Sequence, residues 1–526
     1  MAYDFIIVGG GSAGCVLAAR LSENPEVNVL LLEAGSRDSH PFYTLPAGFA
    51  KMTKGIGSWG WHTVPQKHMN GMSIRYTQAK VIGGGSSINA QIYTRGNRLD
   101  YDEWRQMGCT GWGYDDVLPF FRKAEDNDTY DNEYHGKGGP LGVSKPAAPL
   151  PICEAYFKAA GELGIPFNED MTGEKQDGVG YYQLTQKHAR RSSTSRAYLA
   201  EARTRRNLTI RTGIETRCLR VENGRVTGVE TASGEVINAA REVLLSSGAI
   251  GSPRLLMLSG IGPKDHLGDL GIEAVFDHPG VGANLQDHLD LFTILECAGD
   301  FTYDKYAEPL WSAVAGLQYL LTRKGPVASS LFETGGFWYA EEGARSPDIQ
   351  FHLGLGSGIE AGVEKMKNPG VTLNSAYLRP RSRGSVRLKS ANPSDAPLID
   401  PNYWADPHDR EMSIRGLKLA QEIMHQKALA PFIKREMIPG PEVKTDEDYF
   451  NYACRHAKTD HHPAGTCRMG NDERAVVDPE LKFNGLDGLR VVDASIMPTL
   501  ISSNTNAAAI MIGEKAADMI AREYRL

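Results

Sequence analysis

A glycine-rich turn near the start of the chain has the residue types and spacing that bind a pyrophosphate. Gly9, Gly11 and Gly14 stand at GxGxxG spacing, and Glu33 follows Gly14 after 19 residues. Gly9 permits a tight turn, Gly11 lets the backbone approach a pyrophosphate, and Gly14 lets a helix pack close to a strand. Glu33 can accept hydrogen bonds from a ribose diol. The alternative is a glycine turn in a fold that binds no nucleotide.

The elements around this turn are those that dinucleotide binding requires. Residues 4–8 (DFIIV) form an apolar run that suits a buried parallel strand, residues 12–22 have the apolar period of a helix, and residues 27–32 (VNVLLL) predict a second strand that ends at Glu33. The helix N-terminus would offer free N–H groups and a partial positive charge to phosphates. This order predicts a dinucleotide site but does not separate NAD from FAD.

A second glycine-rich loop follows about seventy residues after the first. Residues 79–96 read AKVIGGGSSINAQIYTRG, with three glycines and two serines that offer N–H and hydroxyl donors. Two such loops fit a long cofactor that is contacted along its length. Taken alone, the second loop could also be a simple turn.

Two adjacent histidines, His461 and His462, are suited to proton transfer because imidazole titrates near neutral pH. Outside any context, such a pair is more often structural or exposed. We expect a strand here, in which neighbours point to opposite faces, so that only one of the two faces a site.

Five segments, in this order along the chain, resemble the glucose–methanol–choline (GMC) oxidoreductase family. They are GGGSAG (9–14) with Glu33, AKVIGGGSSIN (79–89), GAIGSPRLLMLSGIG (248–262), PGVGANLQDH (279–288), and HHPAGTCRMG (461–470) with VVDASIMPTLISSNTN (491–506). The resemblance runs from Asp4 to about Ile520. It implies an α/β fold with a Rossmann-like FAD-binding domain and a second, substrate-binding domain built on an antiparallel sheet.

The resemblance also implies residue roles around FAD. The residues that match the family's cofactor-binding positions are Gly9, Gly11, Gly14, Glu33, Gly84, Ser87, Asn89, Ala90, Asp493, Ala494, Asn506 and Ala507. Some members attach FAD through a histidine at the position of Ile88, which carries no nucleophile. We therefore expect FAD to be bound without a covalent link, and no metal.

His462 matches the family's catalytic histidine, and Asn504 matches its second site residue, a His or Asn. The resemblance implies that His462 accepts the hydroxyl proton of an alcohol while hydride passes to flavin N5. Because an asparagine cannot act as a base, Asn504 would donate to the forming alkoxide. Glu333, an acid among apolar neighbours, is a candidate for substrate binding or for a salt bridge.

Within the family, three further segments (40–55, 323–340 and 378–388) resemble FAD-dependent L-sorbose dehydrogenases more than choline or primary-alcohol dehydrogenases. We expect oxidation of a sugar or polyol such as sorbose, or of a primary alcohol. Choline, aliphatic or aryl alcohols are the alternative substrates. A lyase or photodecarboxylase on the same scaffold is a more distant one. A quinone, a dye-like acceptor or oxygen could take the electrons, and the sequence indicates neither which one nor the oligomeric state.

Charge and composition limit the kinds of binding partner and the cellular compartment that we expect. The net charge of -7 gives nothing that attracts a polyanion, so nucleic acid is not expected. The seven cysteines are scattered without a CxxC pair, which favours a reducing compartment. With no signal-peptide pattern and no apolar run of membrane-spanning length, we expect a cytoplasmic protein, with peripheral contact to the inner face of a membrane as a further option.

That option depends on residues 310–321 (LWSAVAGLQYLL), which are apolar enough to touch a membrane surface. A helix packed on the core explains the same pattern.

The chain exceeds the length at which one core stops growing, which predicts two domains. We assign residues 1–150, 201–295 and 461–526 to the FAD-binding domain and residues 151–200 and 296–460 to the substrate-binding domain. The strand-like stretch at 371–388 should belong to the antiparallel sheet of the second domain.

Overall fold

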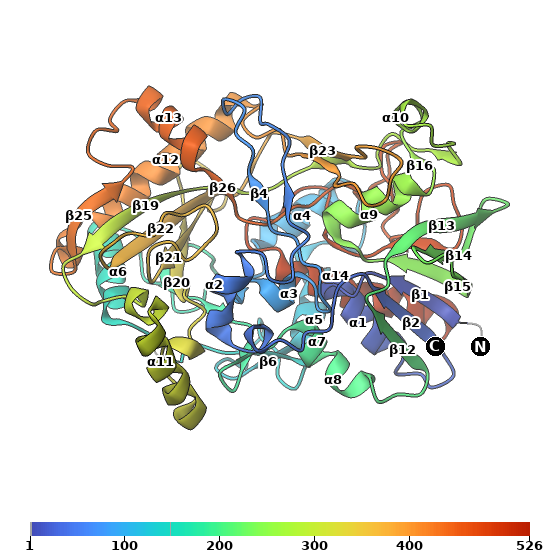
Figure 1. Cartoon of the computed structure of the whole chain (residues 1–526), viewed down its shortest axis with the longest axis horizontal. Coiled ribbons are helices and arrows are strands. Elements are labelled where there is room, and N and C mark those ends of the chain that lie inside the picture. The colour runs from blue at the N-terminus through green and yellow to red at the C-terminus, as the bar shows by residue number, and fades with distance from the viewer. Residues whose placement is uncertain (1–2, 148) are drawn as a thin grey trace.

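The computed structural model describes residues 3–147 and 149–526 and contains two large sheets side by side (Figure 1). The strands of the first sheet are β1 (Tyr3–Val8), β2 (Val29–Glu33), β12 (Leu208–Thr212), β13 (Thr216–Glu222), β14 (Arg225–Thr231), β15 (Val236–Leu245) and β27 (Leu489–Val491). They run in the order β12-β2-β1-β15-β14-β13, with β27 beside β15.

The centre of the first sheet is parallel and buried on both faces. β1 pairs in parallel with β2 on one side and with β15 on the other, and the residues of β2 are all buried. Helix α1 (Ser12–Leu21) follows β1 and packs on β1 and β2, while α14 (Asn506–Tyr524) packs along α1. Apolar runs without alternation are typical of such strands. The predicted strand, glycine turn, helix and strand are therefore confirmed.

The second sheet is antiparallel throughout, as predicted. Its order is β25-β19-β22-β21-β20-β8, with β26 beside β19. Its strands are β8 (Gly178–Tyr181), β19 (Leu289–Cys297), β20 (Thr334–Trp338), β21 (Ile349–Gly354), β22 (Gly370–Tyr377), β25 (Ile433–Ile438) and β26 (Lys458–Thr459). Helix α12 (Pro407–Met424) packs on β19 and β22, so the sheet has its own apolar core.

Two details differ from the expected division of the chain. The expected boundary at residues 295/296 falls inside β19, which belongs wholly to the antiparallel sheet. The segment α7 (Thr194–Ala197) and α8 (Leu199–Ala202) packs against α1 on the dinucleotide side. Tertiary packing, which local composition does not reveal, decides both assignments.

Residues 310–321 form most of helix α11 (Pro309–Thr322), and the expectation that this helix packs on the core is wrong. Only Ala315 and Tyr319 of the helix are buried. In Figure 1 the helix projects from the side of the molecule that holds the antiparallel sheet. No helix in the described ranges is both long and apolar enough to cross a membrane.

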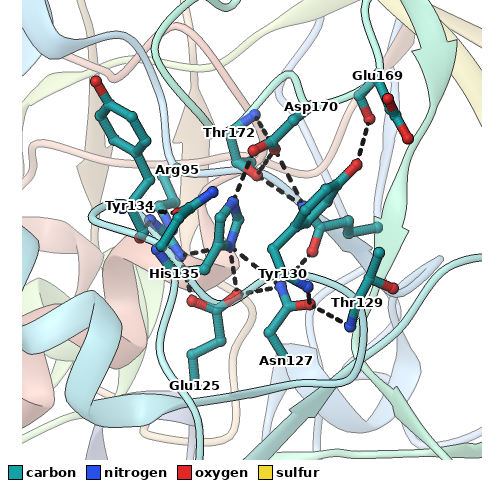
Figure 2. Close-up of polar contacts among 12 residues, drawn as sticks. Arg95, Glu125, Asn127, Thr129, Tyr130, Tyr134, His135, Glu169, Asp170 and Thr172 are labelled. Atoms are coloured by element: carbon teal, nitrogen blue, oxygen red, sulfur yellow. Dashed lines mark hydrogen bonds and ion pairs between the residues drawn. The ribbon is translucent and has the colours of Figure 1, made fainter.

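A buried ionic cluster joins segments that are far apart in the sequence (Figure 2). His135 lies between Glu125 and Asp170, with 2.9 Å from Nδ1 to Glu125 Oε1 and 2.9 Å from Nε2 to Asp170 Oδ2. Arg95 donates to the other oxygen of Glu125, and Asn127 donates to Glu125 Oε1. Although burial opposes it, the carboxylates of Asp170 and Glu125 raise the pKa of His135. The cluster therefore favours a protonated imidazole.

Candidate active site

The first glycine turn leaves no room for side chains. A Cβ on Gly14 would lie 2.0 Å from the carbonyl oxygen of Gly9, and one on Gly9 would lie 2.5 Å from that of Ser246. Gly9 also has a φ of 103°, which only glycine adopts without strain. The turn therefore keeps the N-terminus of α1 open at the edge of the parallel sheet, where phosphates bind.

Glu33 stands beside this turn at the end of β2 and is buried. Its carboxylate accepts the backbone N–H of Gly10 at 2.8 Å and that of Gly35 at 2.7 Å. Burial raises the pKa of Glu33, and these two amides partly oppose the rise. Glu33 therefore stabilises the conformation of the turn. It also lies at the position where the sequence predicts a residue that binds the ribose.

The second glycine loop closes on the first. A Cβ on Gly84 would lie 2.7 Å from Cα of Gly11, so the two loops touch through glycines. The side chains expected to line the loop are already engaged by the protein: Ser87 Oγ donates to the Ile82 carbonyl at 2.8 Å, and Asn89 Oδ1 accepts from Arg191 at 2.7 Å. Their role in the described structure is to shape the loop.

The C-terminal segment completes the cradle. Asp493 accepts hydrogen bonds from the Gly248 backbone at 2.9 Å and from the Ser252 hydroxyl at 2.6 Å. Asn506 donates to Ser12 Oγ at 2.8 Å, which joins the start of α14 to the start of α1. Its carbonyl oxygen is buried without a partner among the described residues, so it is available to a ligand donor.

Two adjoining cavities of about 190 Å³ each run along these residues, and they share Gln78, Ala79, Gly85 and Ala509 as lining. The first is lined by the expected residues Gly9, Gly11, Glu33, Gly84, Asp493 and Ala494. The second is lined by Asn89, Ala90, Asn506, His462 and Asn504. Gly14, Ser87 and Ala507 lie behind the walls. A site in two continuous parts fits a long dinucleotide whose far end reaches His462.

His462 is held in one tautomer by a second histidine. His288 Nε2 lies 3.2 Å from the carbonyl oxygen of Leu378, so this nitrogen must carry the proton. The other nitrogen, Nδ1, lies 3.0 Å from His462 Nδ1 and must accept from it. The lone pair of a neutral His462 is therefore on Nε2, which faces the cavity and Asn504.

The charge state of His462 follows from burial. Burial lowers the pKa of His462 to about 4, and its effect is partly offset by the nearby Asp460 carboxylate. Burial also lowers the pKa of His288 to about 3. Both imidazoles are therefore neutral at neutral pH, which is the form in which Nε2 of His462 can accept a proton.

Asn504 has a fixed amide orientation. Its Oδ1 accepts from Thr94 Oγ1 at 3.0 Å and from Gln350 Nε2 at 2.9 Å. This leaves its amide nitrogen 3.2 Å from His462 Nε2. The structure therefore brings together the two residues that the sequence singled out for chemistry, with a proton acceptor beside a donor.

The expected strand at the histidine pair is absent. β26 ends at Thr459, and His461 has a φ of 62°, in the left-handed region. Because of this turn, both His461 and His462 line the same cavity, so the expectation that only one faces the site is wrong. Burial lowers the pKa of His461 to about 4, and its Nδ1 has no partner among the described residues.

Charged residues that the sequence reasoning missed surround the pair. Asp460 and Glu360 line the cavity, and Lys458 lies 3.0 Å from Glu360 and 2.5 Å from Asp290. Although burial opposes it, the imidazoles of His352 and His462 hold the pKa of Asp460 below its usual range. Burial raises the pKa of Asp290 to about 8. Only the fold brings Asp290 on β19, His352 on β21 and Glu360 to the pair, whereas Lys458 and Asp460 stand beside it in the sequence.

Asp287 and His288 end the PGVGANLQDH segment, but we assigned them no role from sequence. Asp287 accepts the backbone N–H of His462 at 2.8 Å and the hydroxyl of Thr459 at 2.5 Å. Burial raises its pKa to about 6. The adjacent acid and histidine of this segment were the signal available in the sequence. In the structure, Asp287 binds the backbone of His462, and His288 contacts its ring.

Glu333 is fully buried but does not line the second cavity, which its neighbour Phe332 does line. Burial raises the pKa of Glu333 to about 7. The structure does not bring this residue to His462, and the carboxylates at the cavity are Asp460 and Glu360.

Across residues 3–147 and 149–526, no group of three or more His, Cys, Asp or Glu side chains is arranged to hold a metal ion.

The chain is similar to known proteins over nearly its whole length. Two family models, each for GMC oxidoreductases, match residues 3–290 and 380–513. An alcohol dehydrogenase (acceptor) of Pseudomonas putida is 42% identical over 530 residues, which cover 99% of this chain and 96% of that protein. An oxygen-dependent choline dehydrogenase of Escherichia coli strain UMN026 is 43% identical over 534 residues, with 99% and 96% coverage. The solved structure of a formate oxidase of Aspergillus oryzae RIB40, studied for FAD modification, matches with a TM-score of 0.93, 28% identity, and coverage of 100% of this chain and 99% of that one.

Proposed function

This chain belongs to the GMC oxidoreductase family, and from this premise we propose that it oxidises a primary alcohol with His462 as the base. The chain is an FAD-dependent oxidoreductase that acts on CH–OH groups. The observation that carries the proposal is the pair formed by His462 Nε2 and the Asn504 amide nitrogen, 3.2 Å apart on the cavity wall.

FAD fits the two adjoining cavities of the chain. The glycine cradle that a Cβ would fill, the N-terminus of α1 and the unpartnered oxygen of Asn506 are sites for a pyrophosphate and for ring donors. Bound FAD supplies the acceptor for the hydride of the alcohol carbon.

Two residues at the cavity would act on the hydroxyl group of the alcohol, one as a proton acceptor and one as a hydrogen-bond donor. His462 accepts the hydroxyl proton at Nε2, since His288 holds the proton of Nδ1 on the opposite side of the ring. Asn504 has two amide N–H groups, one of which can meet the substrate oxygen while the other faces His462. Such a donor stabilises the charge that develops as the proton leaves.

The lining of the second cavity favours an alcohol with an apolar body. Phe49 and Phe332 form one wall, with ring centroids 5.8 Å apart, and Ile92 lies beside them. A choline-like amino alcohol is the second candidate, because the carboxylates of Asp460 and Glu360 line the same cavity and would attract a cation. Sorbose and other polyols form the third class to test.

Anaerobic reduction of the flavin by a panel of substrates tests the proposal. We expect primary aliphatic or aryl alcohols to reduce the flavin faster than sorbose. Glu360→Gln should selectively slow flavin reduction by choline if choline is the better substrate. If no alcohol reduced the flavin, the proposed activity would be wrong, although the cofactor assignment would stand.

We further propose that FAD is bound without a covalent link. Ile88 lines the second cavity and offers no nucleophile. Acid precipitation should release the yellow colour into the supernatant, whereas colour that stays in the pellet would contradict the proposal.

Glu33 should support FAD binding in two ways, through the ribose and through the turn that it holds. Glu33→Ala removes both hydrogen bonds to Gly10 and Gly35. We expect the variant to fold but to hold less FAD per chain than the wild type, as measured by absorbance after purification. Wild-type FAD content would show that the acid is not needed for binding.

A further inference from the structure

Helix α11 exposes its apolar residues instead of burying them. Among the residues that the structure describes, half of the exposed large hydrophobic side chains lie on this helix: Leu310 (72%), Trp311 (43%), Val314 (46%), Leu317 (58%), Leu320 (68%) and Leu321 (77%). Figure 1 shows the helix projecting away from the body of the molecule. Contiguous exposed apolar patches on soluble proteins mark interaction sites.

The spacing places these residues on the outer face. Leu310, Val314, Leu317 and Leu321 follow the i, i+4, i+7, i+11 pattern, which puts them on one side of a helix. Ala315 and Tyr319, the two buried residues, lie on the opposite side. An ordinary surface helix has the reverse arrangement, so the outer face of α11 is available to an apolar partner.

Cations gather at the C-terminal end of the helix. Arg323 and Lys324 follow it directly, and the Tyr319 hydroxyl donates at 2.9 Å to the carbonyl of Ala189. Ala189 lies in the turn of the hairpin β10 (Gln186–Lys187) and β11 (Arg190–Arg191). Within the described ranges, the side chains of Arg190, Arg323 and Lys324 form no ion pair.

This basic end continues into a cleft. Arg190 and Arg323 line a cavity of about 810 Å³ together with Lys187, Arg196 and Arg205, and the acids Glu23, Asp126 and Glu201 line it too. Lys187 pairs with Asp126 and Arg196 pairs with Asp38, so Arg190 and Arg323 are among the cations of this lining that remain for a ligand. At the other end of the helix, Lys305 lies 5.5 Å from the ring of Trp311. Glu308 and Asp300 are exposed acids there, and Asp300 pairs with Lys305 at 2.9 Å. An apolar stripe with a tryptophan and a cationic edge is the pattern of a helix that lies in a membrane interface.

We propose that α11 and the adjoining hairpin dock this protein on an anionic phospholipid bilayer, with the helix lying in the plane of the interface. A helix of 14 residues is too short to span the hydrocarbon core. A second copy of the chain could cover the leucines, but a lipid interface also offers phosphates to the side chains of Arg190, Arg323 and Lys324, which form no ion pair among the described residues. Charge complementarity therefore favours anionic lipid.

The docking surface lies beside the substrate cavity. After α11 the chain forms η4 (Pro326–Ala328), which packs against η2 (Pro46–Gly48). Phe49 and Phe332, which line the cavity, flank these two turns along the chain. Docking would hold this wall of the cavity close to the lipid.

Co-sedimentation of the FAD-loaded protein with vesicles tests the proposal. Vesicles of phosphatidylcholine and phosphatidylglycerol in equal parts should bind the wild type, and vesicles of phosphatidylcholine alone should bind it less. Leu317→Glu/Leu321→Glu should lower binding about 100-fold, since two leucines lose their burial. Arg323→Glu/Lys324→Glu should lower binding to the anionic vesicles about tenfold or more. Val236→Glu/Val275→Glu, at exposed valines on the dinucleotide side, is the matched control and should bind like the wild type.

Analytical ultracentrifugation of the same samples separates lipid from a second copy. The proposal expects the wild type and Leu317→Glu/Leu321→Glu to have the same mass without lipid. A wild-type dimer that the leucine variant dissociates, together with no binding to either vesicle, would overturn it. Equal binding by the wild type and the leucine variant would overturn it as well. Flavin content and reduction rate report whether each variant is folded.

Discussion

Two buried histidine clusters in this protein use the same residue types in opposite ways. In the cluster around His135, the two ring nitrogens contact Glu125 and Asp170, and the pKa of the imidazole is raised. In the other cluster, His288 Nδ1 lies 3.0 Å from His462 Nδ1, and burial lowers the pKa of His288, His461 and His462. The fold favours the protonated form of His135 and the neutral form of His462.

The two clusters also differ in how completely their hydrogen bonds are formed. Among the described residues, buried polar atoms without a partner include seven that line the second cavity, in Thr53, Gln91, His352, Asn374, Asp460, His461 and Asn506. None occurs in Arg95, Glu125, Asn127, His135 or Asp170. A fully bonded network specifies structure, whereas unmet donors and acceptors that face a cavity mark where a ligand belongs.

The sharpest test of this contrast is the removal of His462, the proposed base. His462→Ala should slow flavin reduction by alcohol about 10²–10⁴-fold, as expected when a general base is removed. FAD content and the apparent Tm should change little. His425→Ala, at an exposed histidine, is the control and should react like the wild type. If His462→Ala reduced the flavin at the wild-type rate, another residue would have to be the base, and His461 would be the next candidate.

The opposite result is expected at the ionic cluster. Arg95→Met leaves the carboxylate of Glu125 buried with one cation fewer, and breaking a buried pair in this way costs about 3–5 kcal/mol of stability. Urea denaturation should show the loss, while the reduction rate per folded, FAD-loaded chain stays close to that of the wild type. Arg98→Met, at an exposed arginine, should be nearly neutral. A selective loss of rate in Arg95→Met would remove the distinction between the clusters.

Asn504→Ala should have a smaller effect on chemistry than the loss of the base. Removing one donor to a developing oxyanion costs roughly 10²-fold or more in rate. The variant also loses the hydrogen bonds from Thr94 and Gln350 but no charge, so we expect stability to fall only slightly. Stopped-flow reduction measures the effect, and Asn392→Ala, at a surface asparagine, serves as the control. A rate within twofold of the wild type would exclude a role for the amide.

The smallest expected effects are the opposite pH slopes of the two clusters. Because the pKa of His135 is raised in the fold, its contribution to stability is full below about pH 6.5 and is lost as pH rises through the folded pKa. Because the pKa of His462 is lowered to about 4, stability falls as pH drops from about 6.5 toward that value.

Apparent Tm across pH for the wild type, His135→Gln and His462→Gln measures these slopes. The Tm difference between the wild type and His135→Gln should shrink as pH rises, by about 1–2 °C. The apparent Tm of the wild type should fall further below that of His462→Gln as pH falls. Slopes of the same sign would show that the two histidines do not differ in charge.

The sequence by itself determined the elements whose signal is local. The buried runs of β1 and β2, the glycine turn between them and the acid at Glu33 all depend on residues close together in the chain, and all appear where predicted. The GMC family and its FAD cofactor followed from five ordered segments. His462 and Asn504 were named from the same segments, and they do meet at one cavity.

Tertiary structure alone decided what surrounds these residues. The tautomer of His462 is fixed by His288, which stands 174 residues before it in the chain. The tautomer of His288 is fixed in turn by the carbonyl of Leu378, 90 residues after it. The left-handed turn at His461 brings both histidines to one cavity, and Glu333 lies outside it although its sequence neighbourhood suggested a binding role. The outward face of α11 has the same amphipathic period as a packed helix. Periodicity records that one side of a helix is apolar, and only the fold decides whether that side faces the core or the outside.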